Sequence, residues 1–287
     1  MTEGFSIAKA LTAAAPTLSF EFFPPKDEAG ANSLRNSIEE LMTLSPDFVS
    51  VTYGAMGSNQ DSSVAIVEQL SKIVATVAHL TCIGASTSGI QNLLMRYQSA
   101  GVAAILALRG DKPKGYDEQP AGDFTYASDL VRQVKQFTSF EVGVAAFPEK
   151  HPESHSLADD IRILKMKQDT GASFAMTQLF FDVEAYSQLV SSARAEGVTI
   201  PIIPGVMPFE NARQVLRMAQ MSGATVPPEL DLKLSQAFSE EAARTIGMDF
   251  SVHLVQDLLA AGAPGIHIFT LNQHRATLEL ANSANLA

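Results

Sequence analysis

The chain has 287 residues, of which 46% are hydrophobic and 18% charged, so it can bury a substantial core in one large domain. Its net charge is −11 and its basic residues are scattered, which argues against nucleic acid or an anionic membrane surface as a partner. No apolar run reaches the ~18 residues of a membrane helix, and the N-terminus lacks the basic region of a signal peptide. The single cysteine, Cys82, has no partner for a disulfide within the chain. We therefore expect a cytoplasmic protein.

Strand-like runs alternate with helical patterns along the chain. Strands are predicted over residues 18–23, 48–53, 78–83, 103–108, 141–147, 173–181, 200–206 and 265–271. Helices are predicted over residues 32–43, 62–77, 88–100, 125–137, 157–169, 183–196 and 209–221, with two more within 231–261. Eight strands that alternate with helices are typical of parallel βαβ units.

The number and spacing of these units favour a closed barrel. We predict a (β/α)8 TIM-type barrel of the α/β class, forming a single domain over residues 1–287 with an N-terminal extension at 1–16. The alternative is an open doubly wound sheet, in which a glycine-rich turn that binds phosphate is expected after the first strand. Pro24 and Pro25 stand at that position, and the chain contains neither a dinucleotide-binding glycine fingerprint nor a P-loop motif.

Glu21 is the most informative residue of the first predicted strand. Alternation along the strand sends Phe20 and Phe22 to one face and Glu21 to the other, and two prolines then end the strand. A carboxylate in such an apolar strand is costly to bury unless it is protonated, paired or used in chemistry. A structural ion pair with an arginine such as Arg109 is the alternative to a functional role.

Side chains suited to chemistry recur at the carboxyl ends of the other predicted strands, where the active site of such a barrel lies. These positions are Thr52, Tyr53, His79, Thr81, Arg109, Gly110, Asp111, Phe147, His151, Gln178, Pro204–Met207, Thr270 and Asn272. So many hydrogen-bonding groups on one rim predict a binding site for a large polar ligand.

Each of these residues also has a structural interpretation. Asp111 suits the cap of a following turn or helix, His79 suits a satisfied core histidine, and Gln178 needs only some partner for its amide. His151 and His155 have the spacing of helical metal ligands, but Pro152 follows the first of them and the segment is a predicted loop, so we expect no metal site.

Seven motifs, distributed over the strands, resemble the 5,10-methylenetetrahydrofolate reductase family in its short bacterial form. They are SFEFFPP at 19–25, SVTYGA at 50–55, HLTC at 79–82, ALRGD at 107–111, YASDL at 126–130, TQLFFD at 177–182 and IPG at 203–205. The resemblance runs over nearly the whole chain. It implies a barrel that holds FAD, takes hydride from NADH or NADPH, and reduces 5,10-methylenetetrahydrofolate to 5-methyltetrahydrofolate for methionine synthesis. It also implies a homo-oligomer.

The resemblance assigns roles to individual residues. Glu21, close to apolar Phe neighbours, is then the general acid that protonates the departing nitrogen of the methylene bridge, and Asp111 stabilises the resulting cation and tunes the flavin. Asp111, Gln178, Gln214 and Gln273 are the implied folate contacts. The implied FAD contacts are Thr52, Tyr53, Ala55, His79, Arg109, Gly110, Asp111, Tyr126, Ala127, Phe147, His151, Asp160 and Lys167.

The chain departs from the family pattern at four positions. Phe147 stands where a tyrosine is common, Ile163 and Met166 stand where polar or basic residues often meet FAD, and Gln273 replaces an expected arginine. We therefore expect FAD to be held weakly. Two other functions stay open at this point: another flavin barrel, such as one that oxidises proline, and a flavin- or folate-binding barrel without turnover.

Overall fold

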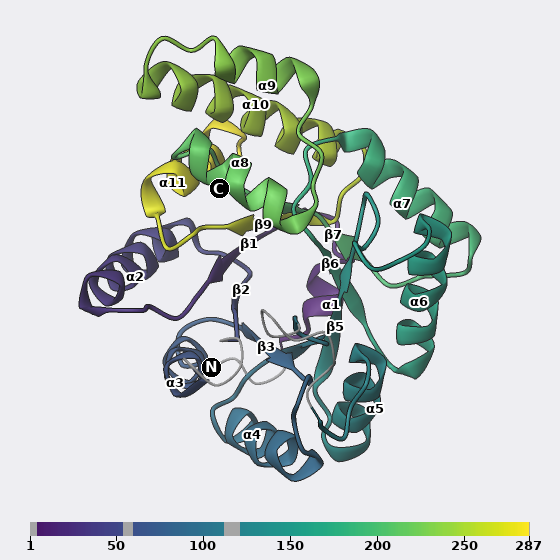
Figure 1. Cartoon of the computed structure of the whole chain (residues 1–287). Coiled ribbons are helices and arrows are strands. Elements are labelled where there is room, and N and C mark those ends of the chain that lie inside the picture. The colour runs from purple at the N-terminus through teal and green to yellow at the C-terminus, as the bar shows by residue number, and fades with distance from the viewer. Residues whose placement is uncertain (1–4, 54–59, 112–120, 287) are drawn as a thin grey trace.

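A computed structural model describes residues 5–53, 60–111 and 121–286. Its strands are β1 (Thr17–Phe22), β2 (Phe48–Val51), β3 (Thr76–Thr81), β4 (Ala104–Leu108), β5 (Glu141–Ala146), β6 (Phe174–Thr177), β7 (Ile202–Ile203), β8 (Gly205–Val206) and β9 (Gly265–Phe269). They pair in parallel in the order β7-β6-β5-β4-β3-β2-β1-β9-β8, and helices surround the sheet (Figure 1). The predicted α/β barrel is confirmed.

The seventh predicted strand is broken at Pro204 into β7 and β8. Ile202 and Ile203 pair with β6, whereas Gly205 and Val206 pair with β9, so the two halves join opposite edges of the sheet and nearly close the barrel. Proline has no backbone N–H to donate to a ladder, which explains why the strand breaks there. The Pro204 carbonyl still accepts a hydrogen bond from the His267 N–H at 3.0 Å.

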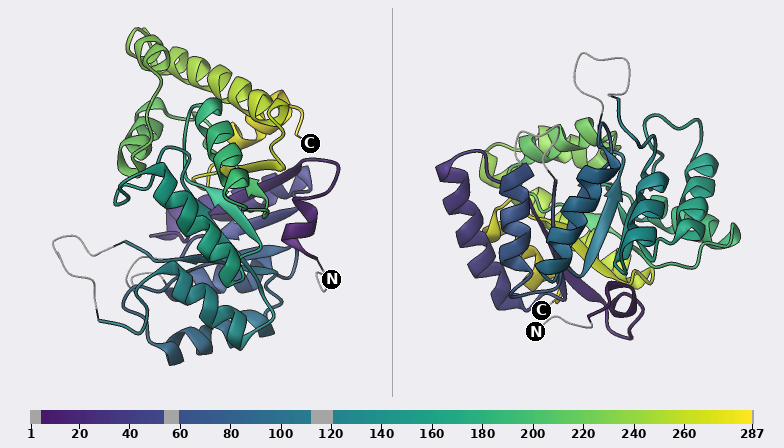
Figure 2. Two further views of the ribbon diagram at one scale, coloured as in Figure 1. Left: turned by 90° about the vertical axis from the view of Figure 1, so that its right-hand side faces the viewer. Right: turned by 90° about the horizontal axis from the view of Figure 1, so that it is seen from below.

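Helices flank the barrel along its length (Figure 2). They are α1 (Ile7–Ala10), α2 (Glu28–Leu41), the 3-10 turn Met42–Leu44, α3 (Gln60–Leu70), α4 (Thr87–Ser99), α5 (Ala127–Phe137), α6 (Leu157–Thr170), α7 (Val183–Ala195), α8 (Ala212–Ser222), α9 (Pro228–Ser235), α10 (Glu240–Ala260) and α11 (His274–Ser283). None of the helices in the described ranges has both the length and the apolar character needed to cross a membrane.

Several elements differ from the prediction. The helix predicted over 62–77 ends at Leu70, because residues 76 and 77 belong to β3. The strand predicted over 173–181 ends at Thr177, and the apolar residues that follow it are buried in a loop instead of a strand. Helix α11 was not predicted, although Ala276, Leu280 and Ala281 give it a buried face at helical spacing.

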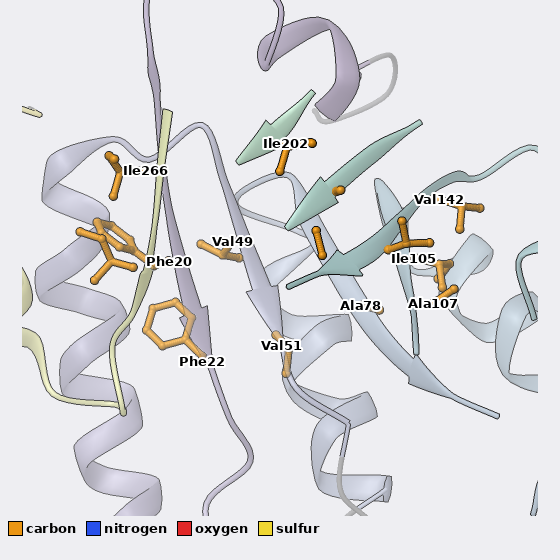
Figure 3. Packing of buried hydrophobic residues seen from close by; sticks show 14 of the residues in the cluster. Phe20, Phe22, Val49, Val51, Ala78, Ile105, Ala107, Val142, Ile202 and Ile266 are labelled. Carbon is orange, nitrogen blue, oxygen red and sulfur yellow. The ribbon is translucent and has the colours of Figure 1, made fainter. Parts of the chain in front are cut away.

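The barrel wall has an apolar outer face. Phe20, Val49, Ile105 and Ile266 are fully buried between the strands and the helices, as Figure 3 shows from close by. Because side chains alternate along each strand, the intervening residues face the barrel interior.

Helix α1 closes the end of the barrel where the strands begin. Its Ile7 is fully buried and Leu11, directly after the helix, is almost so; both pack with interior side chains of β2, β4 and β6, such as Phe48 and Phe174. The Ala8 N–H donates to the Glu141 carboxylate at 3.0 Å. Part of the predicted N-terminal extension is therefore a plug in the barrel core (Figure 2).

Candidate active site

Glu21 projects into the barrel interior near the carboxyl end of β1, between two imidazoles. Its Oε2 lies 3.6 Å from His79 Nε2 on β3 and 3.7 Å from His267 Nε2 on β9, and 16% of its side chain is exposed. Phe20 and Phe22 point the other way, into the helix layer. Alternation therefore puts Phe20 and Phe22 across the sheet from the carboxylate, and the phenylalanine beside Glu21 is its register partner Phe269 on β9.

His79 is a buried base with a free nitrogen. Burial lowers the pKa of His79 to about 4 and outweighs the Glu21 carboxylate, which raises it, so the imidazole is neutral near pH 7. Its Nε2 has no hydrogen-bond partner among the described residues. The interpretation of His79 as a satisfied core histidine is wrong, since a buried polar atom without a partner is costly unless a ligand supplies one.

His267, by contrast, is held on every side. Its Nδ1 lies 2.8 Å from Ser19 Oγ and its Nε2 lies 3.2 Å from Ser50 Oγ. Phe48 stacks on the ring with centroids 6.1 Å apart, and Phe269 meets it edge-on at 5.6 Å. The ring is completely buried and fixed in place.

The turn after β9 fixes the backbone around Glu21. The Thr270 hydroxyl donates to the Glu21 carbonyl at 2.7 Å, while the Asn272 side chain accepts from the Phe23 N–H and donates to the Phe23 carbonyl. Asn272 and the preceding Leu271 have φ values of 55° and 50°. This left-handed pair turns the chain so that the Asn272 amide meets the end of β1.

Two adjoining cavities open at the carboxyl ends of the strands; His79 is among the residues that line them, and Glu21 is not. The first, of about 500 Å³, lies over the carboxyl ends of β2 to β6, and the second, of about 370 Å³, extends over α6; Lys167 and Phe147 are among the side chains that line both. Their linings together contain these residues from the sequence prediction: Thr52, Tyr53, His79, Arg109, Gly110, Asp111, Tyr126, Ala127, Phe147, His151, Asp160, Lys167 and Gln178. Ala55 lies outside the described residues.

Arg109 and His151 form one wall of this cleft. The Arg109 guanidinium donates to both carboxylate oxygens of Glu153, one of them at 3.0 Å, so the ion pair considered between Glu21 and Arg109 is wrong. His151 Nδ1 accepts from the Glu153 N–H at 3.0 Å, and its ring meets Phe147 edge-on with centroids 4.7 Å apart. Burial lowers the pKa of His151, with Arg109 and Lys167 adding to the effect.

Lys167 is the uncommitted cation of the cleft. Asp160 is occupied, since it accepts from the His151 N–H at 2.7 Å and from the Ser154 hydroxyl. The ammonium of Lys167 makes no hydrogen bond or ion pair with any residue in the described ranges, and burial lowers its pKa to about 8 despite the nearby Asp160. An amine held this way suits an anionic ligand that would restore its charge.

The end of β4 brings the backbone close to the cleft. Gly110 has φ of +88°, and a Cβ there would lie 2.8 Å from the Ile83 side chain, so no larger residue fits. Asp111 follows it and is exposed at the rim. Whether Asp111 caps a following turn depends on residues 112–120, which lie outside the described ranges.

The three glutamines predicted to contact folate are not gathered together. Gln178 follows β6 and lines the larger cavity, although its Oε1 accepts from the Leu179 N–H at 2.8 Å. Gln214 is exposed in the first turn of α8 and lines neither cavity of the cleft. Gln273 occupies the N-cap position of α11 without a capping hydrogen bond from its side chain, and its Oε1 is buried with no hydrogen-bond partner in the described part of the chain.

Sequence reasoning missed His267, Ser19, Ser50 and Glu153. Alternation along the first and last strands does place Ser19 and His267 on the interior face with Glu21, so a signal existed. The pairing of β1 with β9 and β2, which puts Ser19 opposite His267 and Glu21 opposite Ser50, could not be read from the sequence.

Residues 6–285 match the family model described as methylenetetrahydrofolate reductase. The chain belongs to the methylenetetrahydrofolate reductase family. It is 36% identical over 259 residues to the 5,10-methylenetetrahydrofolate reductase of Escherichia coli strain K12, covering 89% of this chain and 86% of that protein. It is 34% identical over 284 residues to the probable methylenetetrahydrofolate reductase (NADH) of Oryza sativa, but spans only 48% of that protein's length.

A solved structure has the same fold. It is an uncharacterized protein from Clostridium thermocellum that binds two copies of 5-methyl-5,6,7,8-tetrahydrofolic acid; the TM-score is 0.66 at 17% identity, over 97% of both chains. At this level of identity the likeness supports the barrel architecture alone.

Proposed function

We propose that this protein catalyses the NAD(P)H-dependent reduction of 5,10-methylenetetrahydrofolate to 5-methyltetrahydrofolate, with FAD as its resident cofactor. Family membership supports the reaction, since relatives from bacteria and plants carry that name. The observation that carries the mechanism is the Glu21 carboxylate, which lies between two imidazoles, one of which lines the cleft.

The residues of the cleft fit a flavin nucleotide. A ligand with a diphosphate would pair with the uncommitted Lys167 ammonium, and a hydrogen-bonding ring edge would satisfy the orphaned His79 Nε2. The cavity wall includes Gly110, Ala127 and Ala145. Because these residues have no side chain or only a methyl group, a flat ring can approach the backbone there. When bound, FAD accepts hydride from the nicotinamide and returns it to the one-carbon unit of the folate.

Glu21 supplies the proton in this scheme. Its carboxyl group protonates the departing nitrogen of the methylene bridge; that carbon–nitrogen bond breaks and leaves a folate iminium cation, whose carbon then takes up hydride. Asp111 stabilises the positive charge from the rim of the cleft, and Gln178 orients the pterin by hydrogen bonds. We also assign Gln214 and Gln273 to the outer part of the folate.

Replacing Glu21 with Gln separates the two halves of the reaction. Only folate reduction needs a proton delivered to a leaving nitrogen, so its rate should fall by about 10²–10⁴-fold, while flavin reduction by NAD(P)H stays within a few-fold of wild type. Stopped-flow flavin absorbance measures both steps separately. The matched control is Glu68→Gln, which removes a surface carboxylate that pairs with Arg96. A folate step within about threefold of wild type would rule out Glu21 as the acid.

A further inference from the structure

Glu153, which sequence reasoning missed, lies on the wall that the two cavities of the cleft share. Arg109, His151, Glu153 and Lys167 each line both cavities, so these four residues lie where the cavities meet. Glu153 belongs to the loop between β5 and α6. It holds two of the other three residues at once, His151 through its backbone and Arg109 through its side chain.

The backbone of Glu153 determines which nitrogen of His151 carries the proton. The Glu153 N–H donates to His151 Nδ1 at 3.0 Å, and a peptide N–H can only donate, so Nδ1 bears a lone pair and no proton. The neutral ring then carries its proton on Nε2. No residue in the described ranges bonds Nε2, and this nitrogen is not among the buried atoms, so it can donate to a ligand in the cleft.

The surroundings of His151 keep the ring neutral. Burial lowers the pKa of His151 most strongly; Arg109 and Lys167 act in the same direction, against Glu153 and Asp160. A protonated ring would have a hydrogen on Nδ1 and would lose the bond from the Glu153 N–H. The neutral ring and the conformation of this loop therefore depend on each other.

The side chain of Glu153 fixes the guanidinium of Arg109. The two carboxylate oxygens accept from the two terminal nitrogens, one of them at 3.0 Å, and Arg109 Nε donates to the Gly110 carbonyl at 3.2 Å. Three of the five guanidinium N–H groups are thus used, and no residue in the described part of the chain takes the other two. The guanidinium cannot turn without breaking these bonds.

The loop that carries Glu153 is itself held by several bonds. The His151 N–H donates to the Asp160 carboxylate and the Lys150 ammonium donates to the Ser154 carbonyl, both at 2.7 Å. Lys150 has a φ of 104°, which residues with a side chain rarely adopt and which persists only where the surroundings impose it. Glu153 is therefore placed by a constrained loop, which suits a residue that positions others.

We propose that Glu153 is a positioning residue of the cleft: its peptide N–H fixes His151 and its carboxylate fixes Arg109, so that both side chains present N–H donors to a diphosphate. The oxygens of an ionised diphosphate only accept, and the Lys167 ammonium adds a further donor at the same wall. That the diphosphate belongs to a flavin nucleotide rests on the proposed function, whereas the arrangement of donors does not.

The first test is calorimetric titration of the full chain, freed of flavin, with ADP. Glu153→Asp keeps the charge and the peptide N–H, but its shorter side chain cannot meet both terminal nitrogens of Arg109 where they now lie. We expect ADP to bind about tenfold more weakly, the effect of one lost bond to a charged group. In an Arg109→Met background the same change should have almost no further effect, because Glu153 acts through Arg109.

The matched control is Glu68→Asp, which shortens the carboxylate partner of Arg96 in a pair outside both cavities and should leave ADP binding unchanged. Tighter binding in Glu153→Asp would mean that Glu153 competes with the ligand for Arg109. An equal loss in both backgrounds would mean general damage to the loop. Either result would overturn the proposal, as would a wild type that does not bind ADP.

The second test is nitrogen NMR of histidine in the protein without ligand. The chain has six histidines, and the signals that disappear in His151→Asn identify the ring of interest. We expect the proton on Nε2 at neutral pH, both in the wild type and in Glu153→Asp, which keeps the N–H. A proton on Nδ1 of His151 would overturn the proposal. A wild type that binds ADP as expected but does not reduce methylenetetrahydrofolate would instead overturn the proposed function and leave this inference standing.

Discussion

At the scale of single residues, the two carboxylates of the candidate site lie in different environments. Glu21 is largely enclosed and faces two imidazole nitrogens, whereas Asp111 is exposed at the rim of the cleft. An enclosed carboxyl group suits proton donation, and an exposed carboxylate suits stabilisation of a cation. The assignment of acid to Glu21 and of counter-charge to Asp111 follows this difference.

Lys167 should make FAD binding depend on pH. Burial holds the pKa of its ammonium at about 8 in the free protein, and a bound diphosphate would raise it. Affinity is then fully present below pH 8 and falls above it, by up to about tenfold for each pH unit. Fluorescence titration with FAD between pH 7 and 9.5 measures this. Lys167→Met should flatten the curve, while Lys165→Met, which removes an ion pair with Asp169, should not.

The sequence predicts which residues lie near the cleft better than it predicts their hydrogen-bond and ion-pair partners. Strand ends are visible as apolar runs that stop at prolines or polar residues, which is how Glu21 and Gln178 are found. The role of Arg109 depends on Glu153, which lies 44 positions away in a loop, and no local pattern reports that pairing. His267 is hidden for the same reason, since its hydroxyl partners come from other strands.

At the scale of elements, α6 presents a mixed surface to the smaller cavity. Asp160 and Lys167 line it together with Ile163 and Met166, which are 40% and 46% exposed. The predicted helix therefore brings these four side chains to one wall. Apolar side chains cannot hydrogen-bond a nucleotide, and each lost bond to a charged group costs about 1.5–3 kcal/mol.

The protein should therefore purify with less than one FAD per chain. Flavin released by heat after long dialysis measures the occupancy, and added FAD should restore activity. Met166→Arg should tighten binding by about tenfold or more, because a cation there can meet the nucleotide phosphates. Arg162→Met serves as the control, since Arg162 pairs with Asp159 on the same helix. Full occupancy in the wild type would show that other contacts suffice.

The α1 plug should contribute strongly to stability. Ile7→Ala and Leu11→Ala each remove a buried side chain from the interior of the barrel, which costs about 2–5 kcal/mol. Urea unfolding followed by circular dichroism measures the loss, and the exposed Lys9→Ala is the matched control. Equal midpoints for all three variants would mean that the plug adds nothing to the barrel.

Strand periodicity predicted the barrel, but neither the split of the seventh strand nor the plug. Pro204 splits the seventh strand because proline lacks an N–H, and the sequence shows the proline without showing that both halves stay paired. The plug is a helix of four residues, too short for any periodic pattern to stand out.

At the scale of the whole molecule, the described strands form one sheet that nearly closes into a barrel, and the candidate site lies at one end of it. The family model covers residues 6–285, so the resemblance and the barrel coincide in extent. The homo-oligomer that the resemblance implies stays a prediction, and light scattering against the chain mass of 30.7 kDa measures it.

The plug has a kinetic consequence. With Ile7 and Leu11 closing the far end, both reactants of the proposed reaction would reach a bound flavin through the same mouth, and we expect them to occupy it in turn. We therefore expect ping-pong kinetics: double-reciprocal plots against NAD(P)H at several folate concentrations should be parallel, and each reactant should compete with the other at high concentration. Intersecting lines would mean that the cleft holds both reactants at once.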